Sequence, residues 1–134
     1  MGNSGSIVAY NASFEKTRLR EASEAYPEYQ GWVAAIEERI VDLLTPFRGF
    51  LFYHPDQAGS ASLKKVLPVM TNSNYNTMEI TDGSMASMEY YRVTFGKNID
   101  EKDRQRVFGA LEKYCDLDTK GMVEILDELR KVCD

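Results

Sequence analysis

The sequence predicts an α/β fold that is predominantly helical. One observation is a short apolar run, Ser6–Tyr10, whose β-branched and aromatic residues favour a buried strand. The other is a series of later segments in which apolar residues recur at helical spacing. With 134 residues, 43% of them hydrophobic and 28% charged, the chain has the length and composition of a folded domain with its own core.

The first half of the chain predicts two helices after this strand. Apolar side chains recur on one helical face over Phe14–Tyr26, and Pro27 ends that helix or begins the next one. Helical spacing continues over Trp32–Leu44, so the pattern alone predicts a second helix to about Leu44. The aromatic-rich segment Phe47–Tyr53 predicts a short strand.

The second half predicts three further helices. The first contains Leu63–Leu67 and is closed by Pro68, since proline interrupts a helix. The second begins at a capping residue, either Asp82 or Ser84. The third covers Asp100–Leu129 and carries the longest apolar pattern in the chain.

Composition and charge limit the functions that the chain can have. A net charge of −5, from 16 basic and 21 acidic residues, argues against holding nucleic acid by charge alone. Bound cations could still reverse the local field. If Cys115 and Cys133 lie on one helix, they are about 27 Å apart, which is too far for a disulfide. Two free thiols, with no apolar run of about 20 residues, predict a cytoplasmic protein without a membrane partner.

We interpret residues 1–5 as a flexible lead or expression scar, because they are small and polar. Residues 6–134 are interpreted as a single domain, since neither a linker nor a repeat divides them.

The last predicted helix contains a candidate functional carboxylate. One apolar stripe of this helix runs from Leu111 to Leu129, and Asp118 lies near its centre. A carboxylate in such a stripe must be paired, hydrogen-bonded or bound to a cation. Tyr114 lies one turn earlier and can reach the same place. An equally favoured alternative is a helix break over 114–117, with Asp118 capping a fresh helix.

Glu15 is the second candidate. It follows the predicted strand and opens a helix, and ligands of open α/β sheets gather where such turns lie. A simpler alternative is that glutamate in a first helical turn is favoured by the helix dipole. Taken alone, the position of Glu15 is better explained by the helix dipole than by a ligand site.

Three segments resemble motifs of the DEDD exonucleases. The run Val8–Leu19, with its Asn, Phe-Glu and Leu, resembles their second motif. Tyr114 and Asp118 resemble the third motif in its tyrosine form, Tyr-x-x-x-Asp. Between them, Ser62–Pro68 resembles the Ser-Leu helix of those enzymes.

From about Gly5 to Leu129 the chain is also similar to the bacterial domain-of-unknown-function family 2779, of the ribonuclease H-like group. This resemblance implies a partial ribonuclease H-like fold that lacks its N-terminal strands. It also implies that Arg39–Leu43 is a strand rather than a helix end, with Asp42 near the edge of the site.

The resemblance implies a metal-dependent exonuclease that hydrolyses DNA or RNA from the 3′ end, with Mg²⁺ or Mn²⁺ as cofactor. Two such cations need a cage of hard oxygen ligands about 4 Å apart. Glu15 and Asp118 would be catalytic metal ligands, and Tyr114 would orient the attacking water. Weaker substrate-binding candidates are Asn11, Phe14 and Lys64.

The first motif of these enzymes, Asp-x-Glu, is absent, because no aspartate here is followed two residues later by glutamate. We therefore expect weak or no metal binding and no nuclease activity from the isolated chain, and whether it is an enzyme stays open. The competing interpretation is a non-catalytic domain that binds nucleic acid or protein beside another nuclease module. Missing strands would leave an apolar edge on Ile7–Tyr10, which favours a homodimer through that edge.

Overall fold

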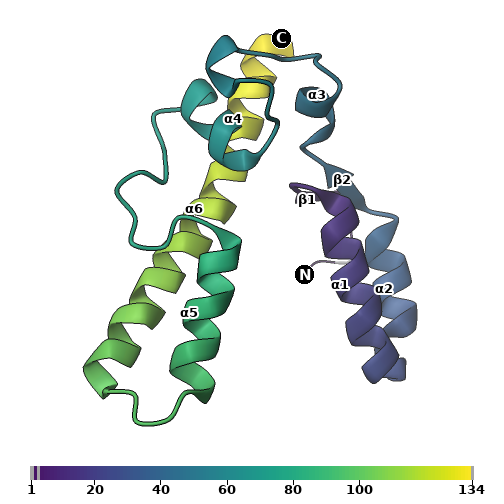
Figure 1. Ribbon diagram of the computed structural model, residues 1–134. Helices are drawn as coiled ribbons and strands as arrows, with labels where there is room; N and C mark the ends of the chain where they lie inside the picture. The colour runs from purple at the N-terminus through teal and green to yellow at the C-terminus, as the bar shows by residue number, and fades with distance from the viewer. Residues whose placement is uncertain (1, 3, 134) are drawn as a thin grey trace. The chain divides into compact units, whose positions relative to one another are not determined.

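The structure is a computed structural model that describes residue 2 and residues 4–133. Within these residues the chain forms two units, the N-terminal unit (Met1–Val69) and the C-terminal unit (Met70–Asp134). The fold is predominantly helical with a small parallel sheet, as predicted (Figure 1). The ribonuclease H-like part of that prediction is not confirmed.

A parallel strand pair lies at the centre of the N-terminal unit. Strand β1 (Ile7–Ala9) pairs with β2 (Ile40–Asp42) in the register Ile7 to Ile40. Parallel strands need a crossover connection, which here is helical. Its elements are α1 (Ala12–Ala25), the 3₁₀ turn η1 (Pro27–Tyr29) and α2 (Gln30–Glu37). The two helices lie side by side in Figure 1.

The end of α2 corrects the helix predicted by pattern as far as Leu44. The backbone N–H of Arg39 donates to the carbonyl of Ile36 at 2.9 Å, which closes the last turn of the helix. The β-branched pair Ile40 and Val41 then continues as strand β2. The pattern was misleading because a three-residue strand is too short to break helical spacing. The strand that the family resemblance implied is confirmed.

The aromatic segment after β2 is not the predicted strand. It forms the short helix α3 (Thr45–Arg48) followed by turns, because Pro46 sits in the first turn, where its missing N–H costs nothing. The N–H of Leu51 returns to the carbonyl of Pro46 at 2.9 Å. Phe47 is 1% exposed, with ring contacts to Tyr10 and Phe52. Phe47 therefore belongs to the core of the unit, whereas Phe50 and Tyr53 of the same segment are exposed.

Two further elements complete this part of the chain. The 3₁₀ turn η2 (Pro55–Gln57) is capped by His54, whose backbone N–H donates to the Gln57 side chain at 2.7 Å. Helix α4 (Leu63–Met70) contains Pro68, so the prediction that this proline closes the helix is wrong. Pro68 lies beyond the first turn, so it removes one backbone hydrogen bond, and the helix ends two residues later at Met70.

The C-terminal unit is built on a helical hairpin of α5 (Gly83–Phe95) and α6 (Glu101–Cys133), side by side in Figure 1. Asp82 caps α5 by accepting the N–H of Met85 at 2.9 Å, so the cap is Asp82 and not Ser84. Helix α6 is continuous for 33 residues. The alternative in which Asp118 caps a fresh helix is therefore wrong.

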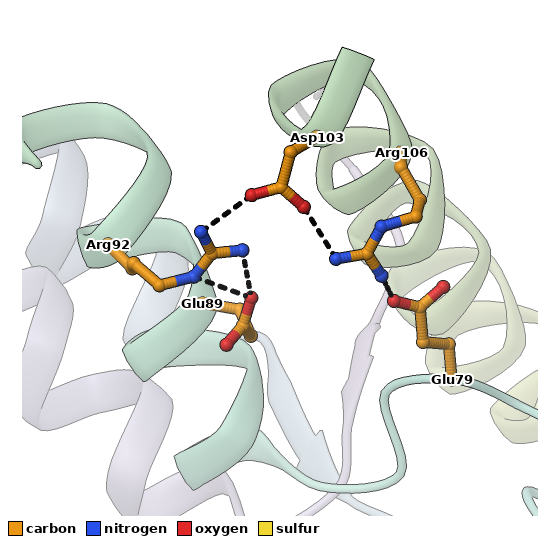
Figure 2. A network of polar contacts seen from close by, with 5 residues as sticks. All are labelled: Glu79, Glu89, Arg92, Asp103 and Arg106. Atoms are coloured by element: carbon orange, nitrogen blue, oxygen red, sulfur yellow. Dashed lines mark hydrogen bonds and ion pairs between the residues drawn. The ribbon is translucent and has the colours of Figure 1, made fainter. Parts of the chain in front are cut away.

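A polar network ties the hairpin together (Figure 2). Arg92 of α5 binds Glu89 at 2.8 Å and Asp103 of α6 at 2.7 Å. Asp103 in turn accepts from Arg106 at 2.6 Å, and Arg106 also pairs with Glu79. Exposed ion pairs stabilise little one by one, but this network joins both helices to the segment that precedes α5.

Two predictions from composition can be compared with the described residues. Cys115 and Cys133 are both free and exposed on α6, as expected. Among the residues that the structure describes, we find no helix with the length and apolar character of a membrane span.

Candidate functional site

The most distinctive polar cluster surrounds Asp118 in the C-terminal unit. Asp118 is half-buried on α6, within the apolar stripe that predicted it. The hydroxyl of Tyr75 donates to its Oδ1 atom at 2.5 Å. Tyr75 is 5% exposed and lies 43 residues earlier in the chain. The carboxylate therefore has a specific hydrogen-bond partner from outside its own helix.

Tyr114 completes the cluster from one helical turn before Asp118. Its ring lies 5.9 Å from the ring of Tyr75, measured between centroids. Burial raises the pKa of Tyr114 to about 12, with the charge and hydrogen bond of Asp118 and then the charge of Asp82 adding to the effect. The phenol therefore stays protonated at neutral pH and remains a hydrogen-bond donor.

A second polar cluster lies at the carboxyl end of the strand pair. Asp42 is the last residue of β2, paired with Ala9, and its Oδ1 accepts the backbone N–H of Asn11 at 2.9 Å and that of Leu44 at 3.0 Å. Asn11 has φ of 68°, a left-handed conformation that asparagine adopts more readily than most residues. The carboxylate thus fixes the chain where β1 leads into α1.

A hollow of about 480 Å³ opens beside this cluster. Tyr10 and Asn11 line one part, and Arg48 and Ser62 contribute polar groups elsewhere. The Tyr10 hydroxyl donates to the carbonyl of Ala61 at 2.6 Å. Burial raises the pKa of Tyr10, Asp42 raises it further and Arg48 lowers it. Tyr10 therefore acts as a neutral hydrogen-bond donor in the wall of the hollow.

The predicted site residues are divided between the two units. Glu15 is exposed in the first turn of α1, and Lys64 is exposed on α4. Phe14 is 56% exposed, and the guanidinium of Arg18 lies 5.4 Å from its ring centre. Within the N-terminal unit the structure brings Asn11 together with Asp42. Within the C-terminal unit it brings together Tyr114 and Asp118, the pair predicted from helical spacing.

The described residues can be tested against the divalent cations that the resemblance implies. Asp118 and Glu15 supply hard carboxylate oxygens, the correct ligand type for Mg²⁺ or Mn²⁺. Such cations need several oxygen ligands, and we find no group of three or more His, Cys, Asp or Glu side chains among the described residues that could hold one. The described residues do not fit a complete cation site, and we assign no reaction step to a cation.

Tyr75 is the member of the Asp118 cluster that sequence reasoning missed. It lies between two predicted helices, in a mostly small and polar stretch for which no helix or strand was predicted. A signal was nevertheless present: a carboxylate in an apolar stripe needs a donor, and Tyr75 is an aromatic hydroxyl in an otherwise small and polar segment. Nothing local in the sequence says which helix it contacts.

The sequence of the chain is similar to one protein family and to several bacterial proteins. Residues 1–62 match the family model of the Domain of unknown function (DUF2779). This span contains β1, β2 and their helical crossover. The predicted resemblance to that domain family is therefore confirmed over residues 1–62.

Longer bacterial proteins match most of the chain. It is 31% identical over 132 residues to the Uncharacterized protein MG366 homolog of Mycoplasma pneumoniae, covering 90% of this chain and 20% of that protein. It is 29% identical to Uncharacterized protein MG366 of Mycoplasma genitalium, with the same coverage. It is 27% identical to Uncharacterized protein UU173 of Ureaplasma parvum, covering 96% of this chain and 21% of that protein.

The chain thus spans about a fifth of the length of these curated relatives. No solved structure matches it. The ribonuclease H-like and exonuclease resemblance receives no support from these comparisons and stays a prediction.

Proposed function

We propose that the chain is the C-terminal part of a metal-dependent exonuclease domain that hydrolyses phosphodiester bonds of DNA or RNA. We propose also that the chain alone is inactive. The observation that carries the proposal is the Tyr-x-x-x-Asp motif: Tyr114 and Asp118 lie one turn apart on an unbroken helix, and the hydroxyl of Tyr75 donates to the carboxylate of Asp118. The run Val8–Leu19, which leads from β1 into α1, supplies the matching second motif.

The side chains of this chain have definite roles in the proposal. Asp118 provides a carboxylate whose position is fixed by a hydrogen bond to Tyr75. Tyr114, protonated because its pKa is raised to about 12, would orient an attacking water through a hydrogen bond that its hydroxyl oxygen accepts. Glu15 provides a second carboxylate from the exposed first turn of α1.

The remaining acidic residues, the Asp-x-Glu pair, would come from another part of a longer polypeptide. The proposal is supported here by the length of the relatives, of which this chain spans about a fifth. Binding of Mg²⁺ or Mn²⁺ would depend on these further carboxylates, since the described residues do not by themselves fit a complete cation site.

The alternative proposal is a non-catalytic domain that binds nucleic acid or protein beside another nuclease module. One observation favours it: Asp118 already accepts a hydrogen bond from Tyr75, and among the described residues no group of three or more His, Cys, Asp or Glu side chains could hold a metal ion. A buried carboxylate with such a partner can serve structure alone.

A nuclease assay on the longer polypeptide separates the two functions. Labelled single-stranded DNA and RNA oligonucleotides are incubated with Mg²⁺ or Mn²⁺ and with wild type, Asp118→Asn or Glu15→Gln. Asp116→Asn is the matched control, because Asp116 is exposed on the same helix. We expect both site variants to reduce cleavage to background while the control retains it. Undiminished cleavage by Asp118→Asn would refute the exonuclease proposal.

A further inference from the structure

We infer that Tyr75 is the positioning residue of Asp118: its hydroxyl holds the carboxylate in one orientation while leaving acceptor capacity for an external ligand. The inference rests on the proposed function, because it concerns how that site is prepared. It assigns a role to a residue outside the three motif-like segments.

The geometry of the contact supports an orienting role. Tyr75 is 5% exposed, and its hydroxyl lies 2.5 Å from Oδ1 of Asp118. Its ring packs against the ring of Tyr114, so the direction of the hydroxyl is set by packing. An aspartate side chain on a helix can otherwise exchange between staggered χ1 rotamers. The buried hydroxyl of Tyr75, which comes from a different segment, favours the Asp118 rotamer that accepts its hydrogen bond.

The carboxylate is oriented without being saturated. An ionised aspartate offers about four acceptor sites on its two oxygens. Tyr75 and Tyr114 each have one O–H to donate, so about two acceptor sites remain for another ligand. Tyrosine hydroxyls therefore suit a carboxylate that must be held in place and still bind something else.

A purely structural role for the Tyr75 hydroxyl is not needed, because other contacts hold the segment that carries Tyr75 in place. Glu79 pairs with Arg106 of α6, as Figure 2 shows. Ile80 is 2% exposed, and Asp82 caps α5. With these contacts on the segment, the effect of the Tyr75 hydroxyl falls mainly on the carboxylate that it touches.

The first test uses the 134-residue chain and needs no enzymatic activity. Three-bond NMR couplings report the χ1 rotamer of Asp118 in wild type, in Tyr75→Phe and in Tyr91→Phe, a control whose ring is 68% exposed. We expect one rotamer in wild type and in the control, and averaged couplings in Tyr75→Phe. An unchanged single rotamer in Tyr75→Phe would overturn the inference.

A measurement on the wild-type chain covers the case in which Tyr75→Phe does not fold. The Tyr75 hydroxyl proton should show a scalar coupling across the hydrogen bond to the carboxyl carbon of Asp118. The coupling would support the inference, and a hydroxyl proton that exchanges freely with water would overturn it.

The second test uses the nuclease assay of the longer polypeptide. Loss of one hydrogen bond to a charged group that acts in the reaction typically costs roughly tenfold in rate. We expect Tyr75→Phe to lower kcat by about tenfold with KM unchanged, and Tyr91→Phe to change neither. If Asp118→Asn abolishes cleavage while Tyr75→Phe leaves kcat unchanged, the inference that Tyr75 positions Asp118 is wrong. If Tyr75→Phe frees the rotamer while Asp118→Asn cleaves normally, the proposed function fails instead.

Discussion

Replacing Asp42 with alanine is expected to destabilise the N-terminal unit by about 3 kcal/mol. One carboxylate oxygen of Asp42 accepts the backbone N–H groups of Asn11 and Leu44 at 2.9 and 3.0 Å. Hydrogen bonds to a charged group contribute roughly 1.5–3 kcal/mol each, and both groups here are part-buried. Taking the lower value for each of the two bonds gives the estimate of about 3 kcal/mol.

Urea unfolding measured by circular dichroism gives the free energy, and amide hydrogen exchange locates the loss. We expect faster exchange at the N–H groups of Asn11 and Leu44 in Asp42→Ala. Asp42→Asn keeps one acceptor oxygen and should cost about 1 kcal/mol. Glu38→Gln is the control, since Glu38 is exposed at the end of α2 and surface changes stay within about 0.5 kcal/mol. A variant Asp42→Ala that unfolds and exchanges like wild type would refute the reasoning.

Two further predictions concern other parts of the chain. Gly96→Ala should destabilise the hairpin by about 2 kcal/mol, because an added Cβ would collide with the backbone carbonyl oxygen of Arg92. Thermal unfolding measures this loss of stability, and an unchanged melting midpoint would contradict the prediction. Tyr10 and Tyr114 should ionise later than exposed tyrosines as the pH is raised, because their pKa values are raised in the folded state. The stabilisation that comes with a raised folded-state pKa is fully present below pH 10.0, the ordinary pKa value. This stabilisation is lost as the pH rises through about 12 for Tyr114. Tyrosinate absorbance and stability should therefore change together in this window, and a single titration of all tyrosines near the ordinary value would count against it.

Local signals were sufficient where the determining contact is local. The start of α5 follows from Asp82, because a side-chain cap acts within three residues. Tyr114 and Asp118 were predicted as neighbours because residues four apart share a helix face. Strand β1 was predicted from its apolar run, although the paired part ends at Ala9.

Tertiary contacts decided the remaining features. The aromatic segment 47–53 was predicted as a strand from its composition, but Pro46 begins a short helix that buries Phe47, while Phe50 and Tyr53 stay exposed. Strand β2 is too short for its pattern to distinguish it from a helix, so only the family resemblance predicted it. Tyr75 meets Asp118 across 43 residues, a separation over which sequence spacing carries no information.

The parallel register of β1 and β2 also sets an order of folding. It pairs Ile7 with Ile40, so the two strands cannot meet until the chain between them has been brought back on itself. Helices α1 and α2 form from local contacts on the microsecond scale, whereas closing so long a segment carries an entropy cost that only later contacts repay. We therefore expect the strand pair to form late in folding of the N-terminal unit, after α1 and α2 have brought its two strands together.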